Sequence, residues 1–181
     1  MPSSPPMRQL LLLRHAKSSW DEATLSDHAR PLNARGKRAA AAMAERMRGL
    51  DLSPDVVLVS SARRTLQTLE ALQPIEGAPI VEVMDALYLA PWAVLLDKLR
   101  AVPETARSVL LIAHNPGLHD LALALTGAGN AGSEMVQRLS EAYPTGSLAE
   151  FSVASLWRDL GEGGGRLVRF LCPRDLPEEA A

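Results

Sequence analysis

The sequence predicts an α/β protein with a mostly parallel sheet. Short apolar runs alternate with longer segments of helical composition along the 181 residues, and polar or turn-forming residues separate them. No break in composition and no internal repeat divides the chain. We therefore expect one domain over residues 9–173, with a short disordered leader at residues 1–8 and a tail at residues 174–181.

The bulk composition argues against several classes of protein. The net charge is -2, so there is no overall basic excess that would suggest nucleic acid or an anionic membrane as the main partner. No apolar run reaches the roughly 18 residues of a membrane span, and the N-terminal MPSSPPMRQ lacks the apolar region of a signal peptide. The single cysteine, Cys172, forbids an intramolecular disulfide, which is compatible with the cytoplasmic location that we predict.

The first half of the chain contains three predicted strands. Gln9–Leu13 is mostly apolar, as is typical of a strand buried on both faces. Gly36–Leu50 is rich in Ala, Met, Arg and Lys and is expected to be a helix. Asp55–Val59 is a second buried strand, and the serines of the following SSARRTLQTLEAL are candidates to cap a helix that runs to about Leu72. Pro79–Val83 is the third strand.

The second half continues the alternation. Pro91–Ala101 is expected to be helical, with the proline in the first turn, and Ser108–Ala113 is another buried strand. A Pro-Gly turn then leads into the helical stretch LHDLALALTG. Two more strands are predicted at Ser147–Val153 and Arg166–Leu171.

Basic side chains follow the predicted strands. In open α/β sheets ligands bind at the carboxyl ends of the strands. The first strand leads into Arg14 and His15, and a later one leads into His114. The second strand leads through two serines to Arg63 and Arg64. Two of the four histidines are thus expected to meet arginines at one edge of the sheet.

Each of these residues also has an interpretation without function. A histidine at the end of a strand is often a half-exposed polar group, and arginines on a helix are usually solvated. Together, however, arginine forks bind phosphoryl oxygens and a histidine among them can attack phosphorus. Such a site performs phosphoryl transfer mainly by positioning and charge stabilisation, without requiring a metal.

Four segments in order resemble the histidine phosphatase, or phosphoglycerate mutase-like, superfamily, and most closely its SixA-like phosphohistidine phosphatases. They are LLLLRHAKSSW, SDHARPLNARG, LVSSARRTLQT and LIAHNPG, and the resemblance runs from about Gln9 to Val153. It implies a three-layer α/β/α sandwich around a mixed sheet. It also implies that His15 is the phosphorylated nucleophile, that Arg14 and Arg64 bind the phosphoryl group, and that His114 contacts its oxygens.

Two positions are left open by this resemblance. Larger relatives have glycine after the nucleophilic histidine, where this chain has Ala16, and alanine disfavours a positive φ. The second open position is that of the general acid, because this chain lacks the inserted segment that supplies a glutamate in the mutases. Asp27 is the first candidate, and the alternative is that Asp27 caps a helix or pairs with Arg30. Ser18 is a further candidate for substrate binding.

The predicted function is that of a metal-independent phosphatase with a phosphohistidine intermediate, acting on protein phosphohistidine. The alternatives are a phosphatase for small phosphomonoesters and a phosphate-binding regulatory module without turnover. No cofactor is expected, because GAGNAG at residues 127–132 follows a helical stretch where a dinucleotide fingerprint needs a strand. The spacing of His114 and His119 does not fit a zinc helix. The oligomeric state stays open.

Overall fold

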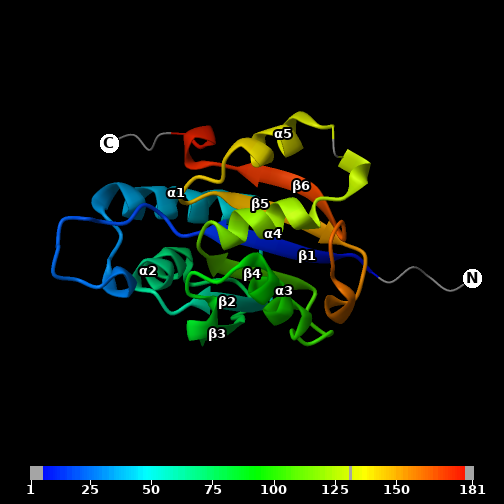
Figure 1. Ribbon diagram of the computed structural model, residues 1–181, viewed down its shortest axis with the longest axis horizontal. Coiled ribbons are helices and arrows are strands. Elements are labelled where there is room, and N and C mark those ends of the chain that lie inside the picture. The colour runs from blue at the N-terminus through cyan, green and yellow to red at the C-terminus, as the bar shows by residue number, and fades with distance from the viewer. Residues whose placement is uncertain (1–5, 131, 178–181) are drawn as a thin grey trace, which may run out of the picture.

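A mixed six-stranded sheet lies between two layers of helices (Figure 1) in the computed structural model, which describes residues 6–130 and 132–177. The strand order is β3-β2-β4-β1-β5-β6. This arrangement confirms the predicted three-layer α/β/α fold. The strands are β1 (Arg8–Arg14), β2 (Val56–Ser60), β3 (Ile80–Met84), β4 (Ser108–Ala113), β5 (Leu148–Val153) and β6 (Gly165–Leu171).

The four strands β1 to β4 are parallel, and the last two run antiparallel to their neighbours. β4 lies between β1 and β2 and pairs with both in parallel. β5 pairs with β1 and β6 pairs with β5, in each case antiparallel. The carboxyl ends of β1, β4 and β2 therefore lie next to one another at one edge of the sheet.

Five α-helices and five short 3-10 turns connect the strands within the described residues. The helices are α1 (Ala34–Gly49), α2 (Arg63–Leu72), α3 (Trp92–Arg100), α4 (Gly117–Leu125) and α5 (Glu134–Glu141). The turns are η1 (Asp27–Ala29), η2 (Asp85–Leu87), η3 (Ala128–Asn130), η4 (Trp157–Asp159) and η5 (Pro173–Asp175).

The four consecutive leucines of β1 divide between two cores. Because side chains alternate along a strand, Leu10 and Leu12 pack against α3 and α4, whereas Leu11 and Leu13 pack against α1 and α2. All four are fully buried, and burial of each such side chain contributes about 1.5–3 kcal/mol. The end of β1 is thus held rigidly from both faces.

Two details of the sequence prediction are wrong. The residue that caps α2 is Ala62, which makes no side-chain capping bond, because Ser60 still belongs to β2. The helix α5 was not predicted, although Ser133 caps it through a bond from the Val136 N–H to Ser133 Oγ. It is only eight residues long and Leu139 is its single fully buried residue, so the stretch is too short for a helical apolar pattern to be recognised from the sequence.

Secondary structure and the core extend beyond the bounds predicted for the domain at both ends of the described chain. Arg8, placed in the predicted leader, is part of β1, whereas residues 1–5 lie outside the described residues. Within the predicted tail, η5 ends at Asp175 and Leu176 is buried in the core that contains α1. Residues 178–181 lie outside the described residues. None of the helices in the described segments is long and apolar enough to span a bilayer.

Candidate active site

Three neighbouring strands bring their carboxyl ends to one site, on the left in Figure 1. Arg14 is the last residue of β1 and His15 follows it, His114 follows β4, and Arg64 lies in the first turn of α2. The imidazole centroids of His15 and His114 are 5.2 Å apart. The structure therefore brings together the four side chains that the sequence predicts to meet.

His15 is held in one tautomer. It is 6% exposed, and its Nδ1 lies 2.7 Å from the carbonyl oxygen of Ala16. A carbonyl only accepts hydrogen bonds, so Nδ1 carries the proton and Nε2 keeps its lone pair. Burial, helped by the charges of Arg64 and Arg14, outweighs this hydrogen bond and lowers the pKa of His15 to about 4. The ring is therefore neutral at pH 7, as a nitrogen nucleophile must be.

The backbone after His15 does not need glycine at position 16. Ala16 is fully buried, has no positive φ, and donates its N–H to Thr68 Oγ1 over 3.0 Å. The residue with positive φ is Gly146 on the facing loop, at φ 76°. Its N–H donates to the carbonyl oxygens of His15 and Arg14, at 2.9 and 3.1 Å. Gly146 thus supplies the left-handed conformation that this close approach requires.

Two guanidinium groups, the buried Arg64 and the partly buried Arg14, flank the histidines. Arg64 is 2% exposed and donates from Nη1 to the Asp27 carbonyl at 2.7 Å and from Nη2 to Asp27 Oδ2 at 3.1 Å. Arg14 donates from Nη1 to the Tyr143 carbonyl at 3.0 Å, and burial followed by the Arg64 charge lowers its pKa. The Nε atoms of both arginines are buried without a hydrogen-bond partner among the described residues. Such adjacent cations suit a doubly charged phosphoryl group.

His114 is oriented by two partners. Its Nδ1 lies 3.3 Å from Arg64 Nη2, and because a guanidinium only donates, Nδ1 accepts. The proton is then on Nε2, which donates to the buried Ser60 Oγ at 2.7 Å. Burial, followed by the charges of His15 and Arg64, lowers the pKa of His114 to about 3. His114 is therefore also neutral at pH 7 in the free protein.

Asp27 is bonded to two arginines. Its Oδ1 accepts from Arg30 Nε and Nη2 at 3.1 and 2.9 Å, and its Oδ2 accepts from Arg64 and from the hydroxyl of Tyr88. Partial burial raises the pKa of Asp27, but the bonds from Tyr88 and Arg30 and the charge of Arg64 outweigh it and lower the pKa to about 2. The alternative stated from the sequence, a salt bridge to Arg30, is confirmed. The general-acid role requires a protonated carboxyl, which this environment disfavours.

These residues line a hollow of about 440 Å³ that opens to solvent. Ser18 is in its wall, where its Oγ accepts from Arg30 Nη1 at 2.7 Å. Trp20 stands at the rim, 76% exposed, with the Arg30 guanidinium carbon 3.5 Å from its ring centroid. Substrate contact by Ser18 stays a prediction.

Sequence reasoning missed three partners of the site: Tyr88, Tyr143 and Asn115. Tyr88 follows η2, outside any recognised motif, and reaches the site only because β3 pairs with β2. Asn115 lies directly after His114 in the LIAHNPG segment, which was the signal that could have found it, and its Nδ2 donates to the Tyr143 carbonyl at 2.9 Å. No three His, Cys, Asp or Glu side chains among the described residues are grouped to hold a metal ion.

Comparison with known proteins shows which family the chain resembles. Residues 10–87 match the histidine phosphatase superfamily (branch 1). An uncharacterized protein of Mycobacterium tuberculosis is 33% identical over 162 residues, covering 90% of this chain and 100% of that protein.

Two solved structures of SixA proteins are also similar. A putative phosphohistidine phosphatase SixA from Nakamurella multipartitia has 31% identity and a TM-score of 0.84, covering 94% of this chain and 99% of that one. The protein histidine phosphatase SixA complexed with tungstate has 25% identity and a TM-score of 0.74, covering 92% and 98%.

The chain belongs to the histidine phosphatase superfamily, in its SixA-like branch. Membership of that superfamily, with these structural neighbours, indicates a phosphatase.

Proposed function

We propose that this phosphatase hydrolyses phosphohistidine on a protein substrate through a phosphohistidine intermediate on its own His15. The neutral ring and the free Nε2 lone pair support His15 as the nucleophile. In the first step Nε2 attacks phosphorus, an N–P bond forms, and the bond to the leaving group breaks with its electron pair. In the second step water attacks the phosphoenzyme, an O–P bond forms, and the electron pair of the N–P bond returns to Nε2.

The surrounding cations stabilise charge on the transferred group. Arg14 and Arg64 provide guanidinium N–H donors beside His15, and both carry a buried Nε without a described partner. His114 shares a hydrogen bond with Arg64, and it gains basicity once a phosphoryl dianion lies nearby. These groups are aimed at the equatorial oxygens, where charge is spread in the transition state.

The state of Asp27 is the observation that carries the choice of substrate. A carboxyl with a pKa of about 2 is ionised at neutral pH, so Asp27 does not hold a proton for the leaving group. His114 is neutral in the free protein, and its one ring proton, on Nε2, is donated to Ser60 Oγ. A phosphohistidine has a ring that is readily protonated before the reaction, so its imidazole leaves as a neutral base without an enzyme acid. We propose a positioning role for Asp27, through Arg64 and Arg30.

The related proteins agree with this substrate class. Two of the structural neighbours are described as phosphohistidine or protein histidine phosphatases. One of them was solved with tungstate, a tetrahedral oxyanion similar to phosphate.

A phosphatase for small phosphomonoesters is the second candidate. The hollow of about 440 Å³ lies within the usual size range of small-molecule sites. Esters with poor alcohol leaving groups need a proton donor in the transition state. This candidate therefore requires a protonated side chain at the site, whereas Asp27 is ionised and His114 is neutral in the free protein.

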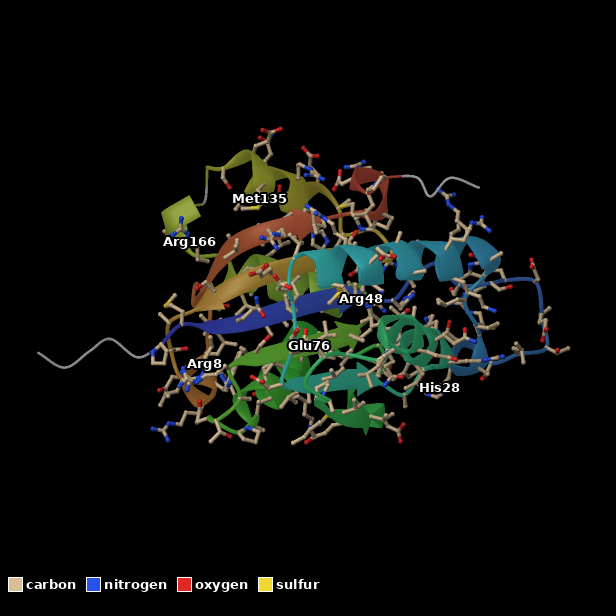
Figure 2. All side chains as sticks on the ribbon, turned by 180° about the vertical axis from the view of Figure 1, so that it is seen from behind. Arg8, His28, Arg48, Glu76, Met135 and Arg166 are labelled. Carbon is tan, nitrogen blue, oxygen red and sulfur yellow. The ribbon has the colours of Figure 1, made fainter. Side chains whose placement is uncertain are left out.

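Labelling with a phosphohistidine donor tests the proposal. The protein is mixed with a peptide carrying ³²P-phosphohistidine and the reaction is quenched. The protein, separated from the peptide, is then examined for acid-labile, base-stable label. We expect label in the wild type and in His28→Ala, and none in His15→Ala. His28 is a useful control because it lies near the site, bonded to Ser61 Oγ at 2.9 Å and labelled in Figure 2. An equal amount of label in His15→Ala and in the wild type would exclude His15 as the nucleophile.

The same assay separates the alternatives. Turnover of sugar phosphates exceeding that of the phosphohistidine peptide would favour the small-molecule enzyme. Phosphate binding without label or phosphate release from any donor would favour the regulatory module. Loss of hydrolysis on treatment with chelators would contradict the metal-independent mechanism.

A further inference from the structure

A groove with unpaired basic side chains leads away from the active-site hollow. The hollow shares Lys17 and Thr145 with a second one of about 210 Å³. The second hollow shares Arg35 and Arg174 with a third of about 560 Å³, in whose wall Arg38 also lies. We define the basic groove by the cations along this path, Lys17, Arg35, Arg38 and Arg174.

The basic groove lies between the beginning of α1 and η5, which contact each other. In Figure 2 η5 lies above α1, in the half of the molecule that also carries the loop after β1. That loop includes Lys17, which lies two residues after His15 and lines the same hollow. The groove is therefore a direct extension of the catalytic hollow along the surface.

The charge of the basic groove is not neutralised by the protein. All four cations are exposed, and none forms an ion pair within the described residues. No aspartate or glutamate lines the second or the third hollow. Asp175 adjoins Arg174, but its Oδ2 already accepts from Arg138 at 2.6 Å. On a chain of net charge -2, this is a local concentration of positive potential beside the active site.

The remaining lining favours a polypeptide over a nucleic acid. Between the cations lie small or aliphatic side chains, including Ala39, Ala42 and Leu176. No aromatic side chain lines the second or third hollow, so these walls offer no platform on which bases stack. The short apolar surfaces and flanking cations match a peptide with alternating acidic and apolar side chains.

We infer that the basic groove is a docking surface for an acidic segment of the protein substrate, next to the residue whose phosphoryl group is removed. This inference rests on the proposed protein substrate. The cations attract the acidic segment and hold it beside Lys17, so that the phosphorylated residue is delivered to His15. Discrimination between protein substrates then arises outside the catalytic hollow.

Binding to a catalytically inactive protein tests the groove separately from turnover. The background is His15→Ala, and the probes are three fluorescent peptides of equal length around a central histidine, with acidic, neutral or basic flanks. The test variant adds Arg35→Glu, Arg38→Glu and Arg174→Glu. The control adds Arg107→Glu, Arg158→Glu and Arg166→Glu, which change charge equally at exposed sites. Arg166 lies at the opposite end of the molecule in Figure 2.

We expect the acidic peptide to bind the background protein about tenfold more tightly than the neutral one at low salt, with the preference falling as salt rises. The test variant should lose this preference and the control should retain it. Arg35→Glu lies in the first turn of α1, where an acidic side chain is compatible with the helix dipole, and circular dichroism checks that the variant is folded. In the His15-containing protein, the same groove substitutions should raise KM for the phosphorylated acidic peptide and leave hydrolysis of p-nitrophenyl phosphate unchanged.

Two results would overturn the inference. The first is an acidic-peptide affinity that is equal in the test variant and the background. The second is a single-stranded oligonucleotide that binds as tightly as the acidic peptide and loses binding in the same variant, which would assign the groove to nucleic acid. If the peptide binds as expected but the wild type hydrolyses no phosphohistidine, the docking surface is supported and the proposed function fails.

Discussion

Replacement of Asp27 by asparagine distinguishes a proton donor from a positioning residue. Asparagine keeps one acceptor oxygen, for Arg30 or for Arg64, and it removes the charge together with the second acceptor. The Asp27 side chain is 42% exposed, so solvent screens its ion pair with Arg64 and the lost charge term is about 1 kcal/mol. That corresponds to a change in kcat/KM of less than about tenfold. A general acid, in contrast, contributes about 10²–10⁴-fold.

The assay is a leaving-group series. Values of kcat/KM are compared for p-nitrophenyl phosphate, phenyl phosphate and an alkyl phosphate, and we expect the Asp27→Asn change to be similar for all three. Asp21→Asn is the matched control, since it removes one charge from an exposed residue of the same loop. A loss above a hundredfold that is confined to the alkyl ester would refute the positioning role and identify Asp27 as the acid.

The same substitution has a predicted effect on acid stability. The pKa of Asp27 in the folded protein, about 2, is below its ordinary value of 3.8. Its contribution to stability is therefore present above about pH 4 and is lost as the pH falls through 2. After the discount for exposure, the wild type should lose about 1 kcal/mol more than Asp27→Asn over this interval, measured by urea unfolding. Equal losses would contradict the lowered pKa.

Three further predictions concern the histidines and the backbone around them. Ser60→Ala leaves the buried Nε2–H of His114 without its acceptor. We therefore expect a loss of about 1–3 kcal/mol in unfolding free energy and a fall in kcat/KM. Unchanged activity would show that Ser60 does not orient His114. The folded-state pKa values of His15 and His114, about 4 and 3, lie below the ordinary 6.5, so the unfolding free energy should fall as the pH is lowered from 6.5 towards 4. Equal urea midpoints at pH 7 and pH 5 would contradict this. Gly146→Ala should destabilise by about 1–2 kcal/mol, because the backbone has φ 76° and the new Cβ would lie 3.1 Å from a proline side chain, whereas Gly49→Ala, with open space around it, should be neutral or stabilising.

The buried strands were predictable because each is a short run of apolar residues in the sequence. The run Gln9–Leu13 is apolar on both faces, and β1 is buried on both faces accordingly. The same reasoning located β4 at its observed bounds. The helix α5 was missed because it has only eight residues, fewer than the roughly 11–18 over which helical periodicity is recognised.

Partners brought in by long-range pairing were not predictable. Tyr88 reaches Asp27 across 61 positions of the chain, and Tyr143 bonds the Leu12 carbonyl across 131. No local pattern encodes such contacts, because they depend on which strands lie next to each other in the folded sheet. The lowered pKa of Asp27 has the same origin, since Arg64 and Tyr88 are distant from it in sequence.

By itself the sequence determined the α/β class, the strand that ends at Arg14, and the residue types that gather at the sheet edge. These follow from composition, alternation and the rule that parallel strands present their carboxyl ends together. Only the tertiary structure decided which nitrogen of His15 is free, that Asp27 is held as a carboxylate, and that a basic groove adjoins the hollow. Protonation and potential depend on burial and on charges within a few ångströms, and those distances exist only once the chain is packed.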